Sequence, residues 1–219
     1  ESYQSWRSFL LSLRARGLSG VRLVVSDAHA GLARAVREVF LGSSWQRCVA
    51  HLERGVAERC RRRGDGAAAI AALKAAFSES DPALVRAGYR RACELLRARD
   101  GAGADLLEEA EPAALAYLDL PREHRLWIRT NNVQERMNRE IKRRTSVVQV
   151  FPSTASLLRL VGAVCCDQND AWACERNFID RRSMEGPLSA APSPEPSPAE
   201  VGSVLALVEE AFDRKLRAA

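Results

Sequence analysis

Two acidic residues and a cysteine–histidine pair stand where side chains can do chemistry. Asp27 follows the apolar run of residues 21–25 in VRLVVSDAHAGLARAV, and Glu135 lies in the basic segment TNNVQERMNREIKRRT. Cys48 and His51, in CVAH, have the spacing of metal ligands. Carboxylates bind hard cations such as Mg²⁺, and a thiolate together with an imidazole binds zinc. Three separate segments therefore carry candidate metal ligands.

Each acidic residue also has an ordinary structural role open to it. Asp27 could cap the helix that follows it, which is the more common role for an Asp at such a junction. Glu135, with Asn132 as the N-cap, would complete a capping-box pattern. It could also pair with Arg139 one turn later. The local pattern alone leaves both alternatives open.

Basic residues surround Glu135 on its predicted helix, opposite an apolar stripe of Val133, Met137 and Ile141. An acid among several basic side chains suits a site for a metal ion and a phosphate backbone. A solvated basic face is the more common meaning of such a pattern. The candidate phosphate-binding residues are Arg136, Arg139, Lys142, Arg143 and Arg144.

Cys48 and His51 lack the partners of a structural zinc site. Such a site takes four ligands, and the sequence has no second pair with matching spacing. We therefore favour a buried cysteine beside a hydrogen-bonded histidine over zinc. Trp45 or Trp127 could stack on an extruded base, but a buried tryptophan is the more common case.

The composition predicts a globular chain with one or two domains. It has 219 residues, 47% of them hydrophobic, and its 33 basic against 28 acidic residues give a net charge of +5. The six cysteines have no framework spacing, so we expect reduced thiols. No leader or membrane span is indicated, which predicts a cytoplasmic protein.

Hydrophobic periodicity predicts the elements that position these residues. An amphipathic helix over 5–16 ends at Gly17, a strand over 21–25 precedes a second helix, and residues 45–50 form a second strand, as in a parallel βαβ unit. A helical block follows over 67–77, 82–99 and 104–118. Further helices are expected at 132 onward, at 153–178 and, after a Pro/Ser linker, at 199–216.

Three sequence blocks, in this order, resemble the Mutator-type, or IS256-like, bacterial transposases. They are SWRSFLLSLRARGLSGVRLVVSDAHAGLARAVREVF, SWQRCVAHL and RTNNVQERMNREIKRRTSVVQVFPSTASLLRLVGAV. The resemblance implies DNA cleavage and strand transfer by a DDE transposase whose two aspartates and one glutamate bind two Mg²⁺ or Mn²⁺ ions. It further implies a homo-oligomer acting on DNA at the nucleoid.

Residue by residue, the resemblance makes Asp27 the second aspartate and Glu135 the glutamate, both as catalytic residues and metal ligands. Cys48 and His51 match the family's C-x2-H element. The implied fold is an α/β, partial RNase H-like core without its first strands, interrupted by an all-helical insertion domain. We expect core parts at 1–52 and 126–185, the insertion at 53–125, and the linker with the terminal helix at 186–219.

The chain also departs from its family, because the first aspartate would lie upstream of Glu1. Because the chain would carry only two of the three catalytic carboxylates, we expect no DNA cleavage by this chain alone. The alternative function is a non-catalytic remnant that binds DNA or inhibits the full-length transposase. A purely structural α/β domain explains each residue singly, but not the ordered blocks.

Overall fold

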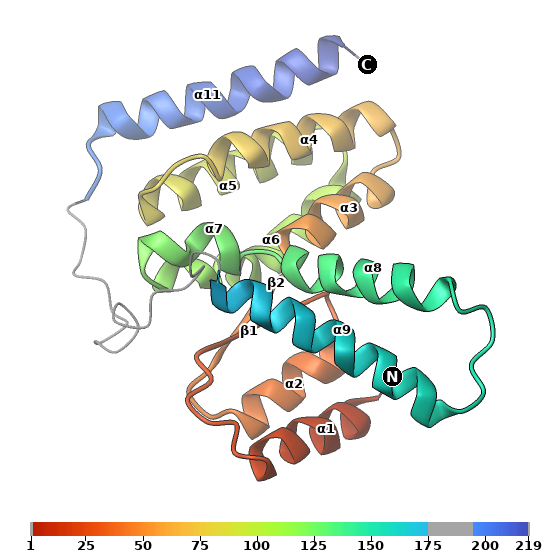
Figure 1. Ribbon diagram of the computed structural model, residues 1–219. Helices are drawn as coiled ribbons and strands as arrows, with labels where there is room; N and C mark the ends of the chain where they lie inside the picture. Colours follow the sequence, from red (N-terminus) through yellow and green to blue (C-terminus); the bar gives the residue numbers. More distant parts are fainter. Residues whose placement is uncertain (1, 175–194, 219) are drawn as a thin grey trace.

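The computed structural model, shown in Figure 1, describes residues 2–174 and 195–218. Within them, a small parallel sheet is surrounded by helices. Strand β1 (Leu23–Ser26) pairs with β2 (Ser44–Arg47), and helix α2 (Ala30–Val39) connects them. The register places Val24 opposite Trp45 and Ser26 opposite Arg47. The predicted parallel pair is confirmed, although β2 ends at Arg47 and not at Ala50.

Helix α1 (Tyr3–Ala15) packs on α2 and forms the first of two hydrophobic cores with it. Leu10, Val36 and Val39 are buried in this N-terminal core, and Val24 and Trp45 of the strands pack against it. Gly17, at φ +101°, ends α1 as predicted: Leu18 N–H donates to Leu13 O at 3.0 Å, and Gly17 N–H to Arg14 O at 2.9 Å.

A second, larger helical core is built by α3 (Val49–Arg59), α4 (Arg63–Ala76), α5 (Pro82–Arg97) and α6 (Gly101–Ala114). Leu52, Leu73, Tyr89 and Leu107 are fully buried in it. Helix α3 was not predicted, and the expected boundary between residues 52 and 53 falls inside it. Its charged sequence, VAHLERGVAER, buries only Val49, Leu52 and Val56, which makes its apolar face hard to see.

The terminal helix α11 (Pro198–Arg217) also belongs to the helical core. It lies along α4 and α5 in Figure 1, and Val204, Val208 and Phe212 are buried there. A capping box between Ser197 and Glu200 starts the helix. Most of the predicted Pro/Ser linker and the predicted end of the helix before it lie outside the described residues.

One buried side chain joins the sheet to the helical core. Gln46 of β2 is fully buried, and its Nε2 donates to Ala114 O at 2.8 Å. Its Oε1 accepts from Tyr117 N–H at 2.8 Å. Helix α6 therefore ends at Ala114 and continues as a 3-10 turn, η1 (Ala116–Asp119), where a single helix over 104–118 was expected.

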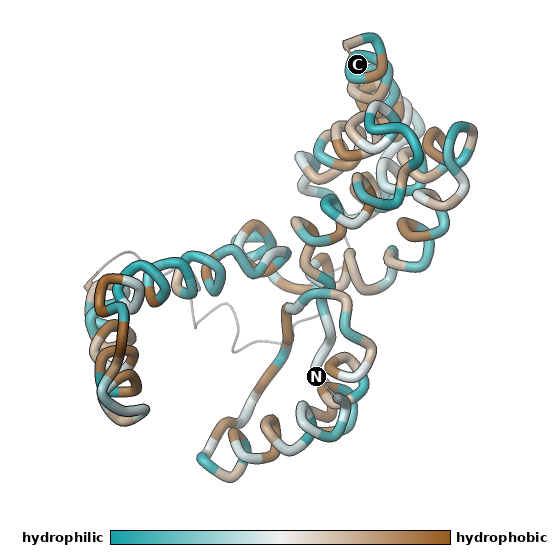
Figure 2. The backbone as a smooth tube through the Cα atoms, turned by 90° about the vertical axis from the view of Figure 1, so that its right-hand side faces the viewer, coloured by the Kyte–Doolittle hydropathy of each residue, from teal (hydrophilic) through white to brown (hydrophobic). Residues whose placement is uncertain are grey.

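After η1, a second 3-10 turn, η2 (Arg122–His124), and the short helix α7 (Arg125–Ile128) lead to α8 (Asn132–Ser146) and α9 (Thr154–Cys174). These last two helices extend away from the rest of the chain in Figure 2. No residue of α8 is buried, and Val164 is the buried residue of α9. Along the apolar stripe of α8, Val133 is exposed and Met137 and Ile141 are half-buried, so the stripe is only partly covered. No helix among the described residues is long and apolar enough to cross a membrane.

Candidate functional site

Asp27 comes directly after β1, and its side chain is 56% exposed. It does not cap α2, because His29 is the N-cap and its Nδ1 accepts from Leu32 N–H at 3.0 Å. The carboxylate of Asp27 instead contacts two residues from later segments. Oδ1 lies 2.8 Å from His51 Nδ1 and accepts from Asn131 Nδ2 at 3.2 Å. The capping alternative for Asp27 is therefore wrong.

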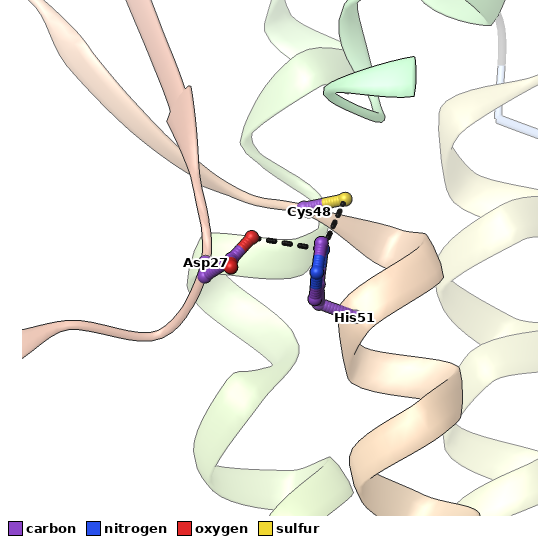
Figure 3. Close-up of side chains that lie close together, drawn as sticks. All are labelled: Asp27, Cys48 and His51. Carbon is purple, nitrogen blue, oxygen red and sulfur yellow. Dashed lines mark hydrogen bonds and ion pairs between the residues drawn. The ribbon is translucent and has the colours of Figure 1, made fainter. Parts of the chain in front are cut away.

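Cys48 and His51 meet Asp27 at the end of the sheet, as Figure 3 shows. Cys48 follows β2, where its N–H donates to Ser26 O at 2.8 Å, and it is the N-cap of α3. His51 lies in the first turn of the same helix, so its Nδ1 approaches Cys48 Sγ to 3.3 Å. Cys48 is fully buried. The prediction of a buried cysteine beside a hydrogen-bonded histidine is confirmed.

Glu135 reaches the same histidine from α8. Its Oε1 lies 3.5 Å from His51 Nε2, the ring nitrogen that faces away from Asp27. The predicted capping box does not form, because the helix begins one residue earlier, with Asn131 as N-cap and no side-chain cap bond. The Glu135 carboxylate therefore faces His51 and does not turn back to the start of the helix.

Asn131 is the functional candidate that the sequence did not reveal. Its Nδ2 donates to Asp27, and its Oδ1 accepts from the Cys48 thiol at 3.0 Å. Because both ends of the amide are engaged in this way, the side chain cannot cap α8. The only local signal is the pair of asparagines ahead of a helix, which normally indicates a cap.

Hydrogen bonds of Arg129 attach the turn before α8 to the start of α3 and to the helical core. Val49 N–H, at the start of α3, donates to Arg129 O at 3.0 Å. Arg129 in turn donates from its guanidinium to Phe77 O at 3.0 Å. The segment carrying Asn131 and Glu135 is therefore attached to both the strand end and the helical core. This attachment brings distant segments to one cluster.

The basic residues of α8 fall into two groups. Arg143 and Arg144 pair with Glu140 on their own helix, at 2.7 and 2.8 Å. First Arg143 and then Arg144 lower the pKa of Glu140 to about 2. Arg136, Arg139 and Lys142 are exposed.

The two candidate tryptophans differ in environment. Trp45 is half-buried against the N-terminal core, and its Nε1 donates to Ser26 Oγ at 2.8 Å. Its polar end therefore contributes to joining the two strands. Trp127 is 43% exposed, so the prediction of a buried side chain is wrong for this residue.

Comparison with known proteins identifies the family. The sequence profile described as "Transposase, Mutator family" matches residues 1–175. The chain is 37% identical over 180 residues to the transposase for insertion sequence element IS406 of Burkholderia multivorans, covering 82% of this chain and 46% of the relative. It is 38% identical over 179 residues to the IS1081 transposase of Mycobacterium tuberculosis, with 82% and 43% covered.

A third relative is the transposase for IS256 in transposon Tn4001 of Staphylococcus aureus, 32% identical over 183 residues, with 82% of this chain and 46% of the relative covered. The chain thus spans less than half the length of these curated relatives. Terminal helix α11 lies beyond the part that matches the family profile. Its family match and these similarities show that the chain belongs to the Mutator family of transposases.

Proposed function

We propose that this chain contributes the second aspartate and the glutamate of a DDE-type, metal-dependent centre for DNA cleavage and strand transfer. Asp27 and Glu135 would hold Mg²⁺ or Mn²⁺ within an RNase H-like core. One observation carries the proposal: carboxylates from the end of β1 and from the first turns of α8 reach opposite nitrogens of one imidazole, His51. Neither carboxylate serves as the helix cap that its local sequence suggested.

The donor set suits such ions. Mg²⁺ prefers carboxylate and water oxygens in octahedral geometry, and both side chains are partly exposed, at 56% and 36%, so solvent can complete a coordination sphere. When bound, a pair of such ions would supply activation of the attacking oxygen and stabilisation of the leaving oxygen of a phosphodiester. Asp27 and Glu135 supply negative charge, and His51 and Asn131 orient Asp27.

The exposed basic side of α8 would hold the DNA backbone beside the carboxylates. Arg136, Arg139 and Lys142 follow Glu135 within about two helical turns and are solvent-exposed. Contacts of this kind give affinity that depends on salt and little on sequence. Substrate would therefore be held by the same helix that carries the glutamate.

The test grafts this chain into the IS406 transposase of Burkholderia multivorans, in place of the 46% of that relative that it matches. We expect strand transfer that requires Mg²⁺ or Mn²⁺. Asp27→Ala and Glu135→Ala should each abolish it while DNA binding is largely retained. Asp105→Ala, at an exposed acid of α6, is the control that should remain active. If either site variant kept its strand-transfer activity, the substituted residue would not be part of the catalytic centre.

The second candidate function is non-catalytic DNA binding, or inhibition of a full-length transposase, by the α8 surface. It is favoured by the exposure of Arg136, Arg139 and Lys142 on α8, a helix in which no residue is buried. This function predicts salt-dependent retention of DNA without any metal requirement. Neutralising Arg139, Lys142 and Arg143 together should reduce retention, and unchanged binding would exclude this helix as the contact.

A further inference from the structure

The cluster at the end of the sheet contains a chemically different set of ligands from the two carboxylates. Asp27 Oδ1, Cys48 Sγ and His51 Nδ1 all lie within 4.8 Å of one another. An oxygen, a sulfur and a nitrogen form a donor set that hard Mg²⁺ does not select, whereas thiolate and imidazole favour zinc and similar transition metals. We infer that Asp27, Cys48 and His51 form a binding site for a thiophilic divalent metal such as Zn²⁺ or Co²⁺.

The distances support closure around such an ion. In a tetrahedral zinc site, the usual bond lengths place a nitrogen and an oxygen ligand about 3.4 Å apart, and a nitrogen and a sulfur about 3.6 Å apart. The corresponding distances are 2.8 Å for His51 Nδ1 to Asp27 Oδ1 and 3.3 Å for His51 Nδ1 to Cys48 Sγ. The first distance would have to lengthen by about 0.6 Å and the second by about 0.3 Å to make room for the metal, a movement that the exposed Asp27 side chain allows.

Two of the three ligands, Cys48 and His51, belong to the start of one helix, α3. Cys48 is fully buried and is the N-cap of α3. His51, one turn later on the same helix, is fixed relative to Cys48. Asp27 is the most exposed ligand, so it can move and leaves an entry path for the ion. On binding, the thiol gives its proton to solvent and the thiolate binds the metal.

The outer contacts are also those of a metal-binding histidine. Such a histidine usually directs its second ring nitrogen to a carboxylate, which fixes the ring and raises its basicity. His51 Nε2 faces Glu135 Oε1 at 3.5 Å. Asn131 contacts both Asp27 and Cys48 and would orient them. Three protein ligands leave a fourth position to water, as in zinc sites that are open to solvent.

This site goes beyond the proposed function, because it requires neither DNA nor a third carboxylate. It has one consequence for that function: a thiophilic metal would engage Asp27 and withdraw it from a Mg²⁺ centre. Zinc is then expected to act as an inhibitor and Mg²⁺ as the activating ion. Metal binding is measured on this chain directly, so its failure is distinguishable from a failure of the proposed catalysis.

The experiment is a Co²⁺ titration of this chain with its three exposed cysteines, Cys165, Cys166 and Cys174, replaced by serine. We expect a saturable thiolate-to-cobalt charge-transfer band and the visible absorption of tetrahedral Co²⁺ at one equivalent. Cys48→Ser should abolish the charge-transfer band, and Asp27→Asn and His51→Ala should each weaken binding. Glu135→Gln should weaken it about 10- to 100-fold, the usual effect of losing an outer-shell partner.

Cys60→Ala is the matched control, since Cys60 is also buried but belongs to the helical core. Its band should remain unchanged. A charge-transfer band that survives Cys48→Ser, or no saturable binding, would overturn the inference. X-ray absorption of the zinc-loaded protein that lacks only the three exposed cysteines tests the ligand set without depending on the folding of the site variants. One sulfur at about 2.3 Å with nitrogen or oxygen neighbours is expected, and the absence of sulfur, or more than one, contradicts the site.

Discussion

His51 lies between Asp27 and Glu135, with Nδ1 2.8 Å from Asp27 Oδ1 and Nε2 3.5 Å from Glu135 Oε1. One imidazole thus links the end of β1 to helix α8. Because the ring contacts both carboxylates, its removal should leave them repelling each other without a fixed group between them. We therefore assign His51 a positioning role in the proposed centre.

His51→Ala should reduce strand transfer by the chimeric transposase about 10- to 100-fold, the scale at which outer-shell partners of metal ligands act. The required Mg²⁺ concentration should rise, which a purely structural defect would not produce. His29→Asn is the control, because asparagine can replace histidine as the N-cap of α2. An unchanged metal requirement in His51→Ala would argue against the positioning role.

Gln46 should be needed to hold the sheet against the helical core. Gln46→Leu leaves Ala114 O and Tyr117 N–H without their partner in a buried environment. Each unpaired group costs about 1–3 kcal/mol, so we expect the free energy of unfolding to fall by roughly 2–6 kcal/mol in urea titrations. Gln134→Leu, on the exposed side of α8, should have little effect. If both variants lost the same free energy of unfolding, the two hydrogen bonds of Gln46 would contribute no specific stability.

Much of the helical part could be predicted from the sequence because its signals are local. Helix α5 was expected at 82–99 and spans Pro82–Arg97, with Asp81 as its cap. Helix α11 was expected at 199–216 and spans Pro198–Arg217. In both, a capping residue followed by proline marks the start and the apolar spacing marks the buried face.

The site was less predictable, because its residues act across long sequence separations. Asp27 and Glu135 each had a local capping role that the structure does not use, since His29 and Asn131 occupy the N-cap positions. Asn131 was missed because its partners, Asp27 and Cys48, come from strand ends far from it in sequence. Periodicity describes what one element buries, and it says nothing about which distant polar groups meet.

Asp100 gives the helical core a defined response to acid. It caps α6, and its carboxylate accepts from Arg61 N–H at 2.9 Å and Gly103 N–H at 2.8 Å. These backbone hydrogen bonds, first from Arg61 and then from Gly103, lower the pKa of Asp100. A lowered folded-state pKa means that the stabilisation is present above the unfolded pKa of about 3.9 and is lost as the pH falls below it.

Asp100→Asn should therefore destabilise the protein by about 1–3 kcal/mol at neutral pH, because the amide has one accepting oxygen and leaves one of the two backbone N–H groups without its partner. The difference from the parent should shrink as the pH falls below about 4, because the parent then loses the same charge. Denaturation midpoints measured across this range give the result. Asp105→Asn, an exposed position on the same helix, should show no such convergence. A difference in stability between Asp100→Asn and the parent that stays constant with pH would contradict the role of the Asp100 charge.

Glu140 should limit the affinity of α8 for DNA, because it neutralises Arg143 and Arg144. Glu140→Gln should tighten DNA binding and steepen its salt dependence. With about 0.9 released counterions per added phosphate contact, the slope should grow by about one to two. Glu109→Gln changes the net charge equally at an exposed position of α6. An equal gain in both variants would mean that net charge alone is responsible.

Helix α11 should stabilise the helical core although it lies outside the family match. Phe212 is 2% exposed between α4 and α5, whereas Leu207 on the same helix is 43% exposed. Phe212→Ala should lower the free energy of unfolding by about 3–5 kcal/mol, the range for removing a buried phenyl ring. Leu207→Ala should cost well under about 1 kcal/mol, as expected for a surface position.

The contact between α11 and α5 adds a second test of the same packing. A Cβ added at Gly88 would lie 2.8 Å from Ala76 Cβ and 3.3 Å from Val204 Cγ1. Gly88→Ala should therefore separate the helices and destabilise the core by about 1–3 kcal/mol, the usual cost of overpacking. Gly202→Ala, on the open side of α11, should be neutral or slightly stabilising, because alanine favours helix. If Phe212→Ala left the urea midpoint unchanged, α11 would not be part of the folded core in solution, and a loss in Gly88→Ala would come from Ala76 of α4 alone.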